Sequence, residues 1–167
     1  MMNTTKPTQT KPLTSIVLAD AALVAAACLI PAVSHLVALP IYWLNPMLAL
    51  LLAGILIGKD WRNTLLLAVL MPLASCLIAG MPAAPKMVCM IAELAVVALT
   101  FHAFEKRSFS KMGVLTAVLL SVVAGRVVYY ALKALIIAPV IGTAWWMQLL
   151  AVLLWGGLFA VAYKRIK

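Results

Sequence analysis

Six long apolar stretches alternate with short polar segments along this chain. They predict membrane-spanning helices over about 13–36, 44–58, 64–79, 87–104, 113–137 and 144–163, because a spanning helix uses roughly 20 mostly apolar residues. The second stretch is short, and Pro72 is expected to break the third. Residues 1–12 are polar and predict a disordered cytoplasmic tail. Residues 13–167 therefore form one six-helix domain, and the fold class is an all-α integral membrane protein.

The composition supports this interpretation and excludes several functions. Of the 167 residues, 66% are hydrophobic and 10% are charged, and the mean hydropathy is +1.15, which leaves almost no soluble mass. The sequence contains no nucleotide-binding loop, metal-ligand cluster or paired nucleophile and base. We therefore expect a protein that is not an enzyme and has no cofactor and no bound metal. Cys28, Cys76 and Cys89 lie inside apolar stretches without ligand-like spacing, so we predict packing roles for them.

The positions of the cations predict the topology. The net charge is +9, but most Lys and Arg residues lie between apolar stretches, as in topology signals, so no nucleic-acid partner is expected. The cations fall in the N-terminal tail, in the loops after the second and fourth stretches, and at the C-terminus. The opposite loops contain only Lys86, while Arg126 and Lys133 lie within the fifth stretch. Because positively charged loops stay on the cytoplasmic side, both termini are predicted to be cytoplasmic.

The segment that follows Gly80 carries the main candidate for a functional site. Its apolar stretch contains Glu93, and an ionisable group at membrane depth usually marks function and requires a partner. Glu93 lies seven residues beyond Lys86, which places it about 10 Å below the outer surface. On the fifth stretch, Arg126 and Lys133 bracket this depth and are the candidate partners.

Other polar residues are expected in the same outer half of the bundle. Together they predict a pocket for a small molecule that opens to the exterior, and two cations against one carboxylate suit a substrate with an anionic group. The predicted substrate-binding residues are Glu93, Arg126, Lys133, Asn45, Tyr129, Tyr130, Gln148 and His35. The alternative is a structural ion pair between Glu93 and Arg126 or Lys133 that fixes the helix register without a ligand.

The first stretch contains small residues at a spacing of four. Ala21, Ala22, Ala25 and Ala26 would form a smooth strip that another helix can approach closely. The strip predicts either packing inside the bundle or docking of a partner protein.

Several landmarks, in this order and spacing, resemble the substrate-binding (S) components of energy-coupling factor (ECF) transporters. They are His35 at the end of the first helix, Leu44-Asn-Pro-Met47 followed by the apolar stretch Leu50-Leu-Leu-Ala-Gly-Ile-Leu-Ile-Gly58, then Pro72, Gly80-Met-Pro82, Ile91-Ala-Glu-Leu94 and Gly125-Arg126. The resemblance covers about residues 14–165.

The resemblance implies a multi-pass protein of the bacterial inner (cytoplasmic) membrane. It implies capture of a vitamin or related micronutrient from outside, and docking of the alanine strip on a membrane coupling subunit with a pair of ATPases. A ligand-free structural or assembly membrane protein of the small cell-shape type is the alternative, with the same six-span outline.

Overall fold

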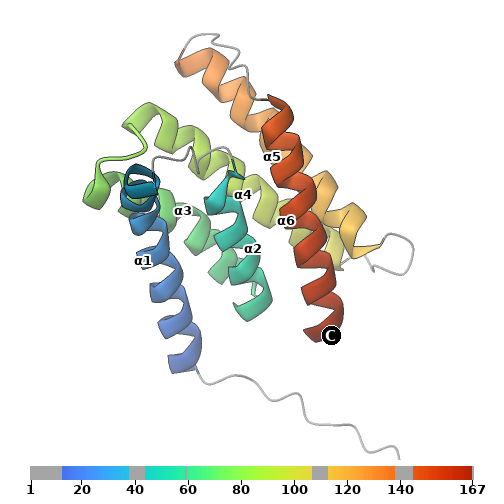
Figure 1. The fold of residues 1–167 in the computed structure, drawn as a ribbon. Helices are drawn as coiled ribbons and strands as arrows, with labels where there is room; N and C mark the ends of the chain where they lie inside the picture. The colour runs from blue at the N-terminus through green and yellow to red at the C-terminus, as the bar shows by residue number, and fades with distance from the viewer. Residues whose placement is uncertain (1–12, 38–43, 59, 107–112, 138–144, 167) are drawn as a thin grey trace, which may run out of the picture.

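Six helices make up the computed structural model, which describes residues 13–37, 44–58, 60–106, 113–137 and 145–166 (Figure 1). They are α1 (Leu13–Val37), α2 (Pro46–Gly58), α3 (Trp61–Ala79), α4 (Ala84–Lys106), α5 (Val114–Ile136) and α6 (Trp145–Ile166). No strand occurs in these residues, so the predicted all-α fold class is confirmed. The predicted disordered tail lies outside the described residues.

Five of the six helices are long and apolar enough to cross a membrane, and α2 is not. Its 13 residues extend for about 20 Å, whereas the hydrocarbon core of a bilayer is about 30 Å thick. The six predicted helices are therefore all present, and the stretch predicted to be short is the one that forms a short apolar helix. The first residues of this short helix, Pro46 and Met47, lie at a cavity.

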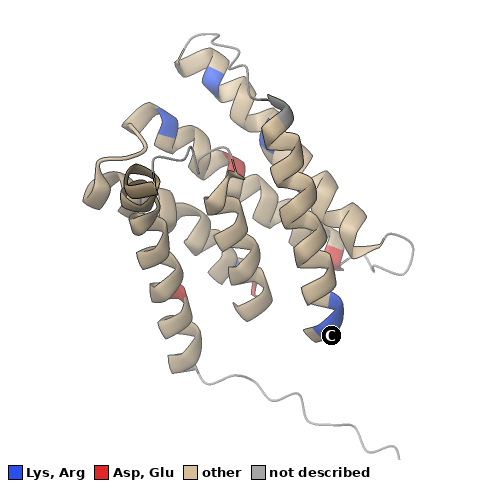
Figure 2. Cartoon of the chain, in the orientation of Figure 1, with Lys and Arg blue, Asp and Glu red and all other residues tan. Residues whose placement is uncertain are grey.

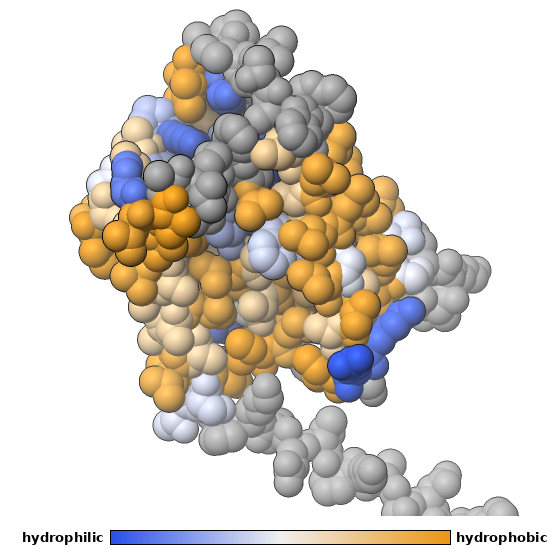
Figure 3. Space-filling view, viewed as in Figure 1, coloured by the Kyte–Doolittle hydropathy of each residue, from blue (hydrophilic) through white to orange (hydrophobic). Residues whose placement is uncertain are grey.

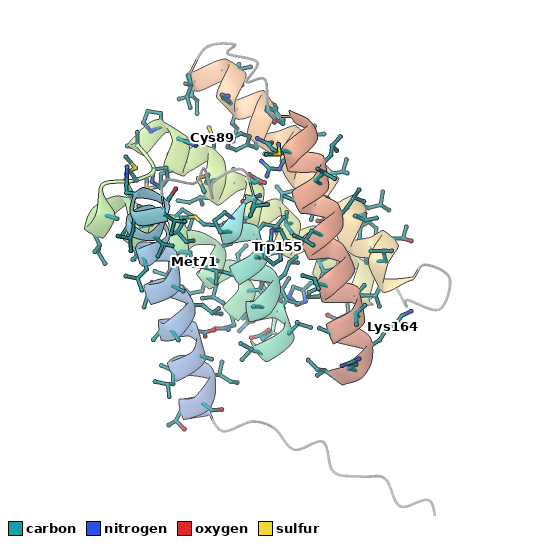
Figure 4. All side chains as sticks on the ribbon, viewed as in Figure 1. Met71, Cys89, Trp155 and Lys164 are labelled. Atoms are coloured by element: carbon teal, nitrogen blue, oxygen red, sulfur yellow. The ribbon has the colours of Figure 1, made fainter. Side chains whose placement is uncertain are left out.

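The helices alternate in direction, and α2 occupies the middle of the bundle. The first turn of α1 and the end of α6 lie on the same side of the molecule (Figure 1), as expected for six helices that alternate in direction. Helix α2 packs against α1, α3, α4 and α6. Its side chains Leu48, Leu51 and Ile55 are completely buried and join Met71 of α3 and Phe101 of α4 in the core (Figure 4).

Helix α3 differs from the sequence prediction in two ways. It begins at Trp61 rather than at residue 64, because the carboxylate of Asp60 caps it by accepting a hydrogen bond from the backbone nitrogen of Arg62 at 3.4 Å. It also continues unbroken through Pro72, which is buried inside the helix. Neighbouring helices allow a proline to remain inside a membrane helix, so the predicted break is wrong.

Buried polar residues form a network at the end of the bundle where α3 begins and α4 and α6 end. The hydroxyl of Thr64 lies 3.1 Å from Nε2 of His102, and Nδ1 of this histidine lies 3.2 Å from the Glu105 carboxylate. Tyr163 of α6 donates a hydrogen bond of 2.6 Å to the same carboxylate. We call this half, with the C-terminus, the inner half, and the opposite half the outer half.

The surface of the bundle is mostly apolar. Figure 3 shows hydrophobic residues over most of the described surface on the face in view, and Figure 2 shows few charged positions on the helices. Helix α1 is the least buried of the five long helices; its strip residues Ala21, Ala22 and Ala25 are exposed and Ala26 is half-buried. A surface of this kind fits a multi-pass protein surrounded by lipid.

Candidate functional site

A cavity of about 320 Å³ lies in the outer half of the bundle. All six helices and the turn between α3 and α4 contribute to its wall. The lining residues are Ile30, Asn45, Pro46, Met47, Ser75, Gly80, Met81, Pro82, Ala83, Lys86, Met90, Glu93, Arg126, Tyr129 and Gln148. This volume is at the lower end of the range for small-molecule sites, and an apolar wall with a few polar groups is typical of them.

The turn after α3 forms one side of the cavity. Gly80 ends α3 in the left-handed conformation, with a φ of 67°, which glycine adopts without steric cost. One turn earlier, the buried hydroxyl of Ser75 donates a hydrogen bond of 2.7 Å to the carbonyl of Met81. These two residues return the chain across the end of α3 and bring Met81 and Pro82 against the cavity.

The short helix α2 begins directly at the cavity. Asn45 precedes it with a φ of 47°, in the left-handed region that asparagine tolerates better than most residues. Its carbonyl accepts the first hydrogen bond of α2, from the nitrogen of Leu48 at 3.1 Å. On α6, the indole of Trp155 donates to the carbonyl of Leu44 (Figure 4). The chain is thus held so that the Asn45 side chain faces Glu93.

Glu93 and Arg126 form an ion pair in the cavity wall. Nε of Arg126 lies 3.2 Å from Oε1 of Glu93, and Glu93 is 3% exposed. The side-chain amide of Asn45 donates to the same carboxylate oxygen at 3.4 Å. Nε of Arg126 is buried, but it is not oriented to donate a hydrogen bond to Glu93 or to any other described residue. The pair balances the two charges, while the Nε–H of Arg126 makes no hydrogen bond within the described residues.

Gly125 allows α4 and α5 to approach closely at the level of this pair. A Cβ atom at position 125 would lie 2.6 Å from Cγ2 of Val97 and 2.8 Å from the carbonyl oxygen of Glu93. Both distances are shorter than van der Waals contact allows, so only glycine fits without a shift of the backbone. Gly125 therefore determines how close Arg126, the next residue, comes to Glu93.

Aromatic and amide groups complete the wall. The ring of Tyr129 lies 5.8 Å from the guanidinium carbon of Arg126, within reach of a cation–π contact. The Tyr130 hydroxyl donates to Oε1 of Gln148 at 2.6 Å. Tyr130 itself is exposed and does not line the cavity, but it contacts two residues that do: it orients Gln148, and its ring packs edge-on against Tyr129 with the ring centres 5.5 Å apart.

A second depression, the α4–α5 groove, adjoins the cavity. It has a volume of about 540 Å³ and is lined by Ala83, Pro85, Lys86, Tyr129, Lys133, Ile136 and Ile137. Ala83, Lys86 and Tyr129 line the cavity and the groove alike, so the two are neighbours separated only by these side chains.

The structure thus brings together five of the eight predicted substrate-binding residues in one cavity: Glu93, Arg126, Asn45, Tyr129 and Gln148. Lys133 lies in the groove, Tyr130 lies behind Gln148, and His35 is exposed on α1 and lines neither depression. Sequence reasoning missed the buried Ser75 and the methionines at 47, 81 and 90. The sequence offered one indication for the methionines: Met47 and Met81 are next to prolines, and Met90 lies three residues before Glu93.

The described residues provide no metal centre. No group of three His, Cys, Asp or Glu side chains among them is placed to hold a metal ion. The free cysteines Cys28, Cys76 and Cys89 are buried or half-buried in the helices.

No known family model, curated protein or solved structure matches this chain.

Proposed function

We propose that this protein is the substrate-capture subunit of an ECF-type importer, and that it binds a vitamin or related micronutrient in the outer-half cavity. The observation that carries the proposal is the buried Nε–H of Arg126, a residue of the wall of the six-helix cavity, which has no hydrogen-bond acceptor among the described residues. An unpaired buried donor is costly unless a ligand or water satisfies it. The order of the motifs that resemble S components supports the same function.

Partner docking is the second part of the proposal. A capture subunit without its own nucleotide site needs ATPases and a membrane coupling subunit to release its substrate inward. The alanine strip supports this step, since Ala21, Ala22 and Ala25 are exposed on the least buried long helix. Small side chains there let a partner helix approach closely.

The capture step is tested by purifying the full chain without partners and identifying co-purified small molecules by mass spectrometry. We expect one compound to be retained by the wild type and lost from Glu93→Ala and Arg126→Ala. The matched control is Lys164→Ala, which changes an exposed cation in the inner half (Figure 4) and should retain the compound. Retention of the same compound by all three variants would contradict the site.

The docking step is tested by co-purification with the coupling subunit and ATPases of an ECF transporter from the same cell. Ala25→Leu should abolish complex formation because the larger side chain blocks close approach, while ligand retention stays normal. Ala131→Leu adds the same volume at another exposed position, on α5, and should leave the complex intact. Equal complex formation by both variants would show that the strip is not the docking surface.

The alternative is a ligand-free structural membrane protein. One observation favours it: the Glu93–Arg126 pair forms within the chain itself and needs no ligand to balance its charges. In that case Glu93→Ala and Arg126→Ala should lower only thermal stability, and no small molecule should be retained by any form of the protein.

A further inference from the structure

The charges in the cavity wall do not cancel. Three acidic or basic side chains line it: Lys86, Glu93 and Arg126. Glu93 and Arg126 lie 3.2 Å apart and balance each other. Lys86 is exposed, and no ion pair joins it to any described residue. The wall therefore carries an excess of positive charge, and the apolar side chains around it reduce screening by water.

Glu93 orients Arg126 and is not itself a site for an anion. Its carboxylate is 3% exposed, accepts a hydrogen bond from the Asn45 amide at 3.4 Å and lies 3.2 Å from Nε of Arg126. The ring of Tyr129 lies 5.8 Å from the guanidinium carbon of the same arginine. These contacts fix the orientation of the guanidinium before a ligand binds. Because a carboxylate only accepts hydrogen bonds, Glu93 cannot hold an anionic group and serves to position Arg126.

The terminal nitrogens of Arg126 are the polar part of this residue that a ligand can reach. Nε is buried, whereas the terminal nitrogens have no hydrogen-bond partner among the described residues and are not fully buried. The side chain is 16% exposed and lines the cavity. The edge of a guanidinium matches the oxygens of a carboxylate or a phosphate in a bidentate contact, so this edge suits an acidic group.

We infer that the ligand carries an acidic group, carboxylate or phosphate, that binds the terminal nitrogens of Arg126 inside the cavity, with Lys86 as the second cation. Glu93 is a positioning residue that holds Arg126 and does not touch the anion. The apolar part of the ligand lies against wall residues such as Met47 and Met90, whose side chains adapt to irregular shapes. This inference rests on the proposed capture function and adds the chemical class of the substrate.

The test uses the purified full chain in nanodiscs of phosphatidylcholine, with affinity selection and mass spectrometry. The probes are matched pairs that differ in one acidic group: nicotinate and nicotinamide, biotin and its amide, and pyridoxal phosphate and pyridoxal. A metabolite extract of the expression host is screened in parallel, and any retained acid is compared with its amide or dephosphorylated form. We expect the acidic member of a retained pair to exceed its neutral partner about 10-fold, because charge-assisted hydrogen bonds are the strong ones.

Variants separate the roles of the three charged side chains. Arg126→Lys keeps a cation beside Glu93 but loses the planar fork, so retention of the acid should fall about 10-fold. Glu93→Ala should abolish retention because Arg126 loses its support, and Glu93→Gln should recover most of it, since an amide oxygen replaces the carboxylate oxygen. Lys86→Ala should lower the preference for the acid and Lys86→Arg should restore it. The distant Lys164→Ala is the control and should change neither quantity.

Several results would overturn the inference, and they differ in what they imply for capture. If neutral compounds are retained as well as acids, capture stands but the cavity does not select an anion. If Arg126→Lys retains the acid as well as the wild type does, Arg126 is not the residue that binds it. Retention of no compound at all contradicts the proposed function itself. If the wild type instead enriches phosphatidylglycerol from nanodiscs of mixed lipid, and Arg126→Lys does not, the anion is a lipid headgroup and not a soluble substrate.

Discussion

Gly125 is the residue that determines how closely the two charged helices of the site can meet. Its missing side chain lets the backbone of α5 rest on Val97 and on the carbonyl of Glu93. Arg126, the next residue, is thereby carried to 3.2 Å from Glu93. The close packing at Gly125 and the distance between Glu93 and Arg126 therefore depend on each other.

Gly125→Ala should therefore damage both stability and the site. The new methyl group overlaps a backbone carbonyl that cannot rotate away, and overpacking of this kind typically costs about 1–3 kcal/mol. We expect a lower thermal midpoint in detergent and weaker retention of any ligand. Gly157→Ala is the control, since nothing lies within 4 Å of a Cβ atom there, and it should leave the midpoint unchanged or raise it. Equal behaviour of the two variants would show that the close approach is unimportant.

The Glu93–Arg126 pair makes a second prediction at the residue scale. Arg126→Met leaves a carboxylate that is 3% exposed without its cation, and breaking a buried pair in this way costs of the order of 3 kcal/mol. Adding Glu93→Gln removes the stranded charge, so the double variant should be more stable than Arg126→Met alone. Thermal unfolding of the four proteins in a double-mutant cycle measures this coupling. Additive effects would mean that the two charges do not interact.

At the scale of the helix, the shortness of α2 shapes the site. Because α2 begins at Pro46, the outer half of the bundle lacks the extra turns that a full span would place there. The cavity lies at this position, and Asn45 to Met47 form part of its wall. One face of α2 is buried in the core through Leu48, Leu51 and Ile55, and this packing holds the start of the helix at the cavity.

The inner ends of α4 and α6 are joined by a contact that the site does not use. Tyr163→Phe removes the hydrogen bond from Tyr163 to Glu105 but keeps the packing of the ring against Phe101 and Phe159. A hydrogen bond to a charged group contributes about 1.5–3 kcal/mol, so the thermal midpoint should fall while ligand retention stays at the wild-type level. Loss of retention in this variant would mean that the two halves of the bundle are coupled.

The sequence determined the elements well because long apolar stretches and their polar boundaries are local signals. The predicted start of α3 was wrong because Asp60, which caps the helix before Trp61, was assigned to a polar loop. The predicted break at Pro72 was wrong because the neighbouring helices that allow a proline inside α3 are not visible in the local sequence. Depth narrowed the partners of Glu93 to Arg126 and Lys133, because the direction of both helices was predicted, and the structure shows that Arg126 is the one in contact.

The rotation of each helix about its axis could not be predicted in the same way. A helix that is apolar all round carries no pattern that says which face is buried. On α1, Leu18 and Leu29 are exposed while Ala27 is completely buried, although all three are apolar. The exposed position of His35 on α1 likewise could not be predicted, because the sequence does not show which face of α1 turns towards the other helices. The placement of Lys133 in the groove, rather than beside Glu93, likewise depends on packing between α4 and α5.

At the scale of the whole molecule, polar groups gather at two levels. The outer level holds the cavity with its ion pair, and the inner level holds the closed network of Thr64, His102, Glu105 and Tyr163. In the inner network the side chains satisfy one another, whereas the outer level leaves the buried N–H of Arg126 unsatisfied. The inner network therefore serves to hold the helices together, whereas the outer cavity contains a donor that a ligand could satisfy.

The orientation of the molecule in the membrane gives the last prediction. Lys86 lies where α4 begins, in the outer half, and Lys164 lies near the end of α6 in the inner half, and both are exposed. After Cys28, Cys76 and Cys89 are replaced by alanine, a single cysteine is introduced as Lys86→Cys or Lys164→Cys. Because positively charged ends stay in the cytoplasm, a membrane-impermeant maleimide should label intact cells carrying Lys86→Cys, and should label Lys164→Cys only after permeabilisation. The reverse pattern would place the cavity on the cytoplasmic side, and a substrate-capture function facing the exterior would then be impossible.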